Sequence, residues 1–214
     1  MSLFRRRRRD GSGDDAAGAG AIDALLVALG NPGSRYAATR HNVGFEIASL
    51  LSARWEMPRA RERFRGRITE GRTRPGGPRV AILLPQTFMN ESGTSAGPAR
   101  GSLRVPLGRV IAIHDEIDLP FGRVRIKVAG GHGGHNGLRS LIEVMEAGFT
   151  RIRVGVGHPG SREQVVDHVL GGFSKEEQKR LADLIGLAAD AAEVVLKEGP
   201  AVAMNRFHPP DSSA

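Results

Sequence analysis

Short apolar runs alternate with turn-forming residues along most of the chain. A strand is predicted wherever such a run is brief and is bounded by Gly, Pro, Asn or charged residues. This criterion predicts strands over 24–29, 64–69, 79–84, 109–113, 123–128 and 152–156. The second and third runs flank the turn sequence PGGP at 75–78, which predicts an antiparallel hairpin.

Apolar residues at helical spacing occur between these strands. The first such set is Val43, Ile47, Leu50, Leu51 and Trp55. The spacing of three or four residues between these positions predicts one helix, and a second helix is expected over 138–145. Ser174 and Glu177 form a capping box that should begin the longest helix, with a short helix after Gly199 and Pro200. Strands alternating with helices predict one α/β domain over 21–208, with a mixed, mostly parallel sheet.

Composition narrows the class of protein. The chain has 214 residues, of which 40% are hydrophobic, enough for one medium domain with a sizeable core. Because it contains no cysteine, disulfide scaffolds, cysteine nucleophiles and thiolate zinc sites are excluded. No apolar run approaches the roughly 18 residues of a membrane span, so we expect a soluble, cytoplasmic protein with no membrane partner.

The net charge of +8 is unevenly distributed. An arginine run at 5–9 lies in a segment without apolar periodicity, and no apolar stretch follows it as in a signal peptide. We therefore expect disordered tails at 1–20 and 209–214. The segment 58–79 contains eight arginines but only two glutamates. Alternate arginines from 59 to 67 indicate either the solvated side of a strand or a phosphate-binding surface.

Polar residues follow several predicted strands. These residues are Asn31, His41, Asn90, Asp115, His135 and Asn136, and the apolar Phe88 and Met89 directly precede Asn90. In an α/β sheet the ligand crevice lies beyond the carboxyl ends of the strands, so separate loops of this kind could form one site. A metal site at His132 and His135 is not expected, because both lie among glycines and no third ligand is evident.

A second kind of chemistry fits the segment 93–97. Its sequence, GTSAG, matches the G-x-S-x-G motif, and Asp115 and His135 follow Ser95 in the order used by α/β hydrolases. A serine esterase using Ser95 is therefore one alternative. The context is unfavourable, since a nucleophile elbow needs an apolar strand leading directly into the serine and residues 89–92 are mostly polar.

Five ordered motifs resemble those of the bacterial-type peptidyl-tRNA hydrolases. They are LGNPG at 29–33 with Tyr36 and TRHNVG at 39–44, TFMNESG at 87–93, HDEIDLP at 114–120, GHGGHNG at 131–137, and Arg153 with GVGHPG at 155–160. The resemblance covers about 25–207 and excludes the arginine-rich N-terminal segment. It implies a single domain with a twisted mixed sheet and helices on both faces. It also implies cleavage of the ester between a peptide and tRNA, freeing tRNA after premature dissociation from ribosomes.

The resemblance also assigns roles to residues. His41 would be the general base, Asp115 would orient it, and Asn31 would recognise N-blocked substrates. Asn90 and Asn136 would hold the peptide and the reacting ester. The pocket beside the terminal nucleotide would be shaped by Tyr36, Phe88 and Met89.

The expected partner is the acceptor arm and 3′ end of peptidyl-tRNA. Lys127 and Arg153 resemble the family's clamp on the tRNA 5′ phosphate. Neither a cofactor nor a metal is implied, and a monomer is expected. A non-catalytic RNA-binding module on the same fold remains the other alternative.

Overall fold

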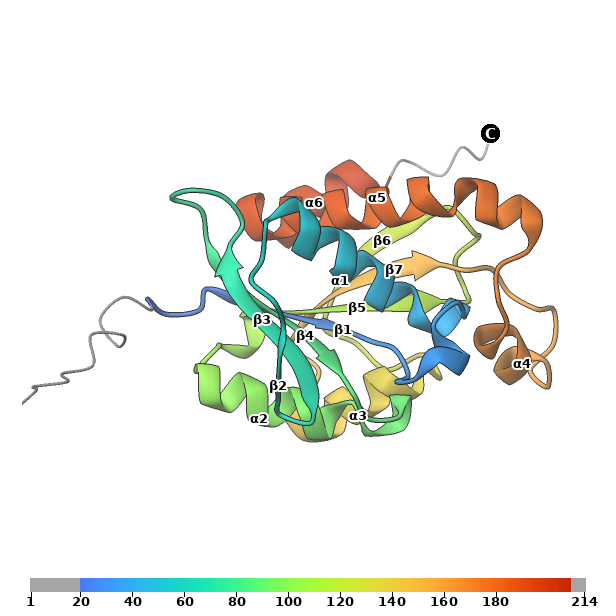
Figure 1. Cartoon of the computed structure of the whole chain (residues 1–214). Coiled ribbons are helices and arrows are strands. Elements are labelled where there is room, and N and C mark those ends of the chain that lie inside the picture. The colour runs from blue at the N-terminus through green and yellow to red at the C-terminus, as the bar shows by residue number, and fades with distance from the viewer. Residues whose placement is uncertain (1–19, 209–214) are drawn as a thin grey trace, which may run out of the picture.

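Seven strands form one sheet in the order β2-β3-β4-β1-β5-β7-β6 (Figure 1). The strands are β1 (Ala24–Ala28), β2 (Arg61–Arg63), β3 (Gly66–Arg72), β4 (Arg79–Pro85), β5 (Val110–Glu116), β6 (Val124–Val128) and β7 (Thr150–Gly155). The structure is a computed structural model that describes residues 20–208. The disordered tails expected at 1–20 and 209–214 lie outside these residues, Gly20 excepted.

The centre of the sheet is parallel and its edges are antiparallel. β1 pairs in parallel with β4 and β5, and β5 with β7. β2 with β3, β3 with β4, and β6 with β7 are antiparallel. The mixed sheet is therefore confirmed. Parallel pairs do not predominate as expected, because β2, β3 and β4 are joined by successive hairpins and β6 runs antiparallel to β7 at the other edge.

Helices cover both faces of the sheet (Figure 1). They are α1 (Val43–Arg54), α2 (Gly93–Leu103), α3 (Asn136–Met145), α4 (Val165–Leu170), α5 (Lys175–Glu198) and α6 (Pro200–Phe207). One apolar core joins α1, α5 and α6 to one face of the sheet, and a second joins α2 and α3 to the other. Along β1, Leu26 enters the first core while Leu25 and Val27 enter the second. A strand that is buried on both faces has a continuous apolar sequence, as β1 does.

Several local predictions are confirmed. Ser174 accepts from the backbone of Glu177 and Glu177 from that of Ser174, so the capping box begins α5 as expected. The hairpin between β3 and β4 and the short α6 also form. Strand β5 runs through Asp115 to Glu116 rather than ending at 113. We had not predicted β2, α2 or α4.

The alternating arginines do not share one strand. Phe64 and Arg65 both have positive φ angles, 57° and 52°, and form a two-residue turn between β2 and β3. Arg61 lies opposite the buried Ile68, on the side that α2 covers, whereas Arg67 pairs with Glu62 on the other side. The prediction that arginines 59–67 project to one side was therefore wrong.

The carboxyl ends of β4, β1 and β5 meet at one edge of the sheet. The chain passes from β1 outward to β4 on one side and then returns to β5 on the other, so the strand order reverses at β1. Such a reversal opens a crevice at the carboxyl ends of parallel strands. Across the described residues, none of the helices is both long and apolar enough to cross a bilayer.

Candidate active site

A cleft of about 900 Å³ lies at this edge of the sheet. Its polar lining residues include Asn31, His41, Asn90, Asp115, His135 and Asn136. Apolar side chains come from Phe88 and Met89 on one side and from α4 on the other, where Val166 and Leu170 are exposed. Polar groups that converge within an otherwise apolar cleft are typical of a ligand site.

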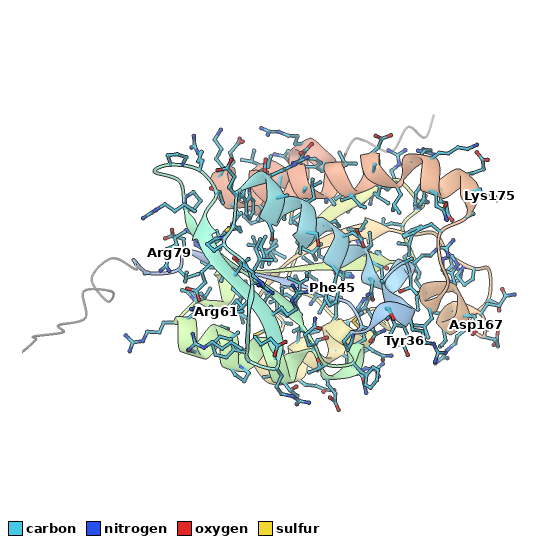
Figure 2. All side chains as sticks on the ribbon, viewed as in Figure 1. Tyr36, Phe45, Arg61, Arg79, Asp167 and Lys175 are labelled. Atoms are coloured by element: carbon cyan, nitrogen blue, oxygen red, sulfur yellow. The ribbon has the colours of Figure 1, made fainter. Side chains whose placement is uncertain are left out.

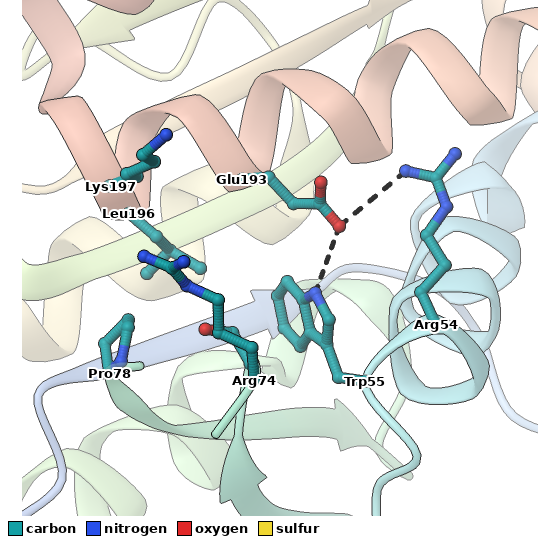
Figure 3. A pocket seen from close by; sticks show the side chains of 8 residues that line it. Arg54, Trp55, Arg74, Pro78, Glu193, Leu196 and Lys197 are labelled. Atoms are coloured by element: carbon teal, nitrogen blue, oxygen red, sulfur yellow. Dashed lines mark hydrogen bonds and ion pairs between the residues drawn. The ribbon is translucent and has the colours of Figure 1, made fainter. Parts of the chain in front are cut away.

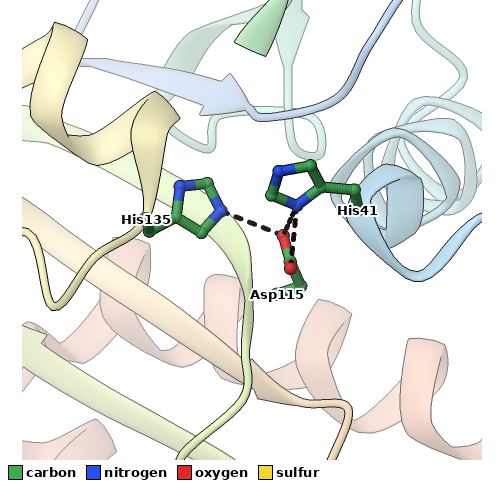
Figure 4. A group of neighbouring side chains, drawn as sticks. All are labelled: His41, Asp115 and His135. Atoms are coloured by element: carbon green, nitrogen blue, oxygen red, sulfur yellow. Dashed lines mark hydrogen bonds and ion pairs between the residues drawn. The ribbon is translucent and has the colours of Figure 1, made fainter. Parts of the chain in front are cut away.

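Asp115 is at the centre of the polar cluster (Figure 4). His41 Nδ1 lies 2.8 Å from Asp115 Oδ1 and 2.9 Å from Oδ2, and His135 Nε2 lies 2.9 Å from Oδ1. The side chains of His41, Asp115 and His135 are 11%, 2% and 9% exposed. Two imidazoles thus provide hydrogen-bond partners for this buried carboxylate.

The backbone places His41 over Asp115. His41 lies in a 3-10 turn, Arg40–Asn42, that leads directly into α1. At Gly44, a Cβ would clash with the carbonyl oxygens of Leu29 and Ile113. Glycine therefore allows the first turn of α1 to rest on the ends of β1 and β5, and His41 reaches the carboxylate from there.

Hydrogen bonds assign the tautomer of His135. Its Nδ1 accepts from the backbone N–H groups of Gly137 and Leu138, at 3.1 and 3.3 Å, as the N-cap of α3. A neutral imidazole that accepts at one nitrogen carries its proton on the other. His135 therefore donates from Nε2 to Asp115 and links this carboxylate to the start of α3.

The same contacts shift pKa values in opposite directions. Burial lowers the pKa of His41, but the charge of Asp115 and its hydrogen bond outweigh burial and raise that pKa above 6.5. Burial raises the pKa of Asp115, yet the positive charge that His41 carries when protonated and the hydrogen bonds from His135 and His41 hold it well below its usual range. Asp115 therefore stays ionised, and His41 Nε2 is the basic position left to the cleft.

His114 is buried directly behind this cluster. Its ring meets that of His135 edge-on at 5.0 Å, and its Nδ1 donates to the carbonyl of Asp115 at 2.7 Å. Burial lowers the pKa of His114 to about 3, so this imidazole is neutral. Its Nε2 has no hydrogen-bond partner within the described part of the chain.

Asn31 is held by two neighbours. Its backbone N–H donates to Asn42 Oδ1 at 2.8 Å, and Asn42 Nδ2 donates to its carbonyl at 2.9 Å. Its own Oδ1 accepts from the backbone N–H of Met89 at 2.8 Å. With the oxygen engaged, the Nδ2 donors of Asn31 remain for a ligand. Asn42 is a positioning residue that we had not singled out.

The other residues expected at the site are placed differently. Phe88 is 58% exposed and Met89 is buried, and both line the cleft with Asn90. Asn136 is the first residue of α3 and also lines it. Tyr36 is half-buried in the turn Ser34–Tyr36 and is not among the lining residues.

Lys127 and Arg153 lie on adjacent strands outside the cleft. In the β6–β7 register Lys127 is opposite Arg151 and Arg125 is opposite Arg153. Lys127 and Arg153 are thus diagonal neighbours on one side of the sheet. Arg153 Nε donates to Glu116 Oε2 at 2.9 Å, and Glu116 lines the cleft. Arg151 bonds the carbonyls of Gly130 and Gly131 and so holds the glycine-rich loop.

The position of Ser95 in the structure argues against the serine-esterase alternative. Ser95 lies within α2, which follows a 3-10 turn (Met89–Glu91) rather than a strand. Its side chain is fully buried, and its Oγ has no hydrogen-bond partner among the described residues. A nucleophile elbow presents its serine at the top of a sheet, so Ser95 is structural here.

Within residues 20–208, His41, Asp115 and His135 are a group whose ligand atoms lie close enough together to be considered for a cation. One ligand atom from each lies within 4.8 Å of the others. Ligands of a tetrahedral zinc are about 3.4 Å apart, given bonds near 2.1 Å. The nitrogen–oxygen distances of 2.8–2.9 Å instead fit hydrogen bonds. The absence of a metal remains a prediction.

A second cavity, of about 330 Å³, lies at the far end of α1 (Figure 3). Trp55 Nε1 donates to Glu193 Oε1 at 3.0 Å, and Arg54 and Arg74 are also in its wall. The 12 residues of α1 separate it from the cleft by about 18 Å along the helix axis. It contains none of the residues predicted to act on substrate.

Comparisons with known proteins agree with this geometry. A model of the peptidyl-tRNA hydrolase family matches residues 25–214. The peptidyl-tRNA hydrolase of Syntrophotalea carbinolica is 45% identical over 185 residues, 86% of this chain and 96% of that protein. The enzyme of Leifsonia xyli subsp. xyli is 47% identical over 188 residues, again 86% and 96%. The crystal structure of Acinetobacter baumannii peptidyl-tRNA hydrolase has a TM-score of 0.81 and 37% identity, covering 89% of this chain and 97% of that one. The chain therefore belongs to the peptidyl-tRNA hydrolase family, whose reaction is the hydrolysis of peptidyl-tRNA.

Proposed function

We propose that His41 is the general base that activates water for attack on the ester of peptidyl-tRNA. The carrying observation is its contact with Asp115, which occupies Nδ1 and leaves Nε2 for a water molecule. His41 takes the proton of the attacking water and later gives it to the departing ribose oxygen. An ester needs less activation than an amide, so the mechanism uses neither a covalent intermediate nor a cofactor.

Asp115 acts through His41. Its charge favours the imidazolium that forms as water loses its proton, and its two oxygens fix the orientation of the ring. His135 supports this arrangement from the other side of the carboxylate. General-base catalysis of this kind contributes about 10²–10⁴-fold to the rate.

Three asparagines bind the peptide and the reacting ester in this proposal. Asn31, with its oxygen held by Met89, offers N–H donors that favour the carbonyl of an N-blocked aminoacyl group. Asn90 and Asn136 lie on two further elements that line the cleft. Amides suit a neutral backbone because each offers both donors and an acceptor, and a fixed donor also stabilises a developing oxyanion.

The tRNA would approach with its acceptor arm, placing the 3′ terminal nucleotide beside Phe88 and Met89. Lys127 and Arg153 would hold the 5′ phosphate, and the ion pair with Glu116 supports this by directing Arg153. Tyr36 would contact the terminal nucleotide from outside the cleft wall. We further infer that residues 21–208 work as one monomeric domain in the cytoplasm, where tRNA is used.

The decisive experiment is His41→Ala assayed on N-acetylated aminoacyl-tRNA. We expect kcat to fall by about 10²–10⁴-fold while the Kd for tRNA changes little, because His41 acts on water. The matched control is His208→Ala, which removes a half-buried histidine bonded to the backbone of Ile126. Undiminished kcat in His41→Ala would contradict the proposal. Wild-type protein that binds tRNA without cleaving it would identify a non-catalytic RNA-binding module.

A further inference from the structure

Arginines gather on the β2–β3 hairpin and the adjoining end of α2. We call Arg61, Arg63, Arg65 and Arg104 the hairpin arginine surface. Arg61 and Arg63 alternate along β2 on the side that faces α2, and Arg63 Nη2 donates to Ser102 Oγ of α2 at 2.9 Å. Arg104 caps the end of α2, two residues beyond Ser102, and is exposed. The side chains of Arg61 and Arg65 are 62% and 60% exposed.

The acidic groups nearby do not cancel this charge. Glu70 is held between Arg61 and Arg79, at 2.5 and 3.2 Å, and only 13% of its side chain is exposed. Two guanidinium groups therefore cover one carboxylate, leaving an excess positive charge at the surface. Glu91 pairs with Arg65 at 3.3 Å, the longer of the two contacts that hold this guanidinium.

Two contacts with described residues hold the guanidinium of Arg63 in place, and they engage only part of its N–H groups. Its guanidinium lies over the ring of Phe64, 4.3 Å from the centroid, while one nitrogen bonds Ser102. Stacking of this kind holds the planar group in place at little cost, because aromatic faces attract cations. An ordered guanidinium with free N–H groups is well suited to the paired oxygens of a phosphate.

The surface begins at the rim of the cleft. Arg65 contacts Glu91 and Thr94, and Glu91 directly follows Asn90, which lines the cleft. From there it extends away from α4: in Figure 2, Arg61 lies on the opposite side of the view from Asp167 of α4. β2 and β6 are six strand steps apart, about 29 Å, so this surface is separate from Lys127.

We propose that the hairpin arginine surface binds the phosphate backbone of the substrate tRNA, away from the terminus held in the cleft. The inference rests on the proposed function for the identity of the RNA. A polyanion that places one end in the cleft while contacting cations at both edges of the sheet must have an extended body, and tRNA does. Each phosphate contact releases counterions, so binding through this surface depends on salt.

The test measures the Kd of deacylated tRNA as a function of salt for Arg61→Gln/Arg63→Gln/Arg104→Gln. We expect about tenfold weaker binding or more at low salt, and a log–log salt slope smaller by about 2–3, near 0.9 for each lost contact. The kcat on a short N-acetylaminoacyl-oligonucleotide should remain normal, which also shows that the variant is folded. The corresponding triple Lys variant should keep most of the slope, because it keeps the charge.

The control is Arg206→Gln, which removes an exposed, ion-paired arginine on α6 at the other face of the sheet. A wild-type salt slope in the Gln variant would overturn the inference, as would equal weakening of tRNA and the short substrate. If the triple variant does not fold, Arg61→Gln alone should change the salt slope by about one-third as much as expected for the triple variant. This single variant should fold, because Glu70 keeps Arg79 as its partner. Deacylated tRNA undergoes no hydrolysis, so the outcome is independent of whether His41 is the base.

Discussion

The cluster around Asp115 and the hairpin arginine surface use charge in opposite ways. In the cluster, one carboxylate with 2% of its side chain exposed is bonded by two imidazoles. On the hairpin, Arg61 and Arg65 remain largely in water. Coulombic interactions are strong in a buried site and are screened within about 8–10 Å at the surface. The buried cluster should therefore control the rate of the chemical step, and the surface should control affinity and its salt dependence.

Replacing Asp115 with Asn should produce the largest effect. The charge is lost, and the new Nδ2 donors can turn toward His41 Nδ1 and favour the tautomer with the proton on Nε2, so we expect kcat to fall by about 10²–10⁴-fold. Activity requires neutral His41, so the wild-type rate should rise with pH through the raised pKa of His41, above 6.5. In Asp115→Asn this rise should move to lower pH, because the charge that raises the pKa is gone. A pH profile of kcat/KM tests this, and an unmoved rise would contradict it.

His135→Ala should have an intermediate effect on both rate and stability. It removes a donor to Asp115 and the N-cap of α3, so we expect kcat to fall about tenfold and stability by about 1 kcal/mol. His135→Asn is the matched variant, because Asn is a good N-cap yet is too short to reach the carboxylate in the same way. Stability should recover in His135→Asn and kcat should not. Recovery of both would show that His135 only caps the helix.

Lys127→Gln should change affinity alone. Lys127 is exposed and lies outside the cleft, so we expect KM for full-length substrate to rise severalfold at low salt with kcat unchanged. The comparison substrate is the same tRNA without its 5′ phosphate. If Lys127 binds that phosphate, dephosphorylation should raise KM for the wild type and change little for the variant. An equal rise in both proteins would refute the assignment.

Ser174→Ala should leave catalysis intact and reduce stability slightly. It removes the capping box of α5, which lies outside the residues lining the cleft. Loss of such a cap costs about 1 kcal/mol, or a decrease in Tm of about 2–4 °C for a domain of this size. Thermal unfolding measures the decrease, and kcat on the short substrate provides the control. A loss of activity would mean that α5 influences the site, through the ion pair of Arg40 with Glu177.

The sequence predicted the elements whose signals are local. Six strands and the helix of the capping box were found because apolar spacing and Ser174 with Glu177 lie within a few residues of each other. Helix α2 was not predicted because its sequence, GTSAGPARGSL, is rich in residues with low helix propensity. At Gly93 and Gly97 a side chain would clash with Ser140 and Val144 of α3. Close packing between helices therefore requires the residues that weaken the local signal.

In the candidate site, too, features with a local sequence signal were predicted and features that depend on distant residues were not. His41, Asp115 and Asn31 belong to motifs and were named from the sequence. Their convergence depends on the order of β4, β1 and β5, which no motif states. His135 was noted but not assigned, because its partner is 20 residues away and its surroundings are glycines. Its position just before a predicted helix was the available signal, since an N-cap can use one ring nitrogen and leave the other for Asp115.

The two occupied nitrogens of His135 have a consequence for the flow of protons. Its Nδ1 accepts from the backbone N–H groups of Gly137 and Leu138, and its Nε2 is directed at Asp115. Asp115 remains ionised, and His114 remains neutral. His41 Nε2 is the imidazole nitrogen left to the cleft. In the proposed mechanism, the proton that His41 takes from water must therefore pass to the leaving ribose oxygen before His41 can activate another water molecule.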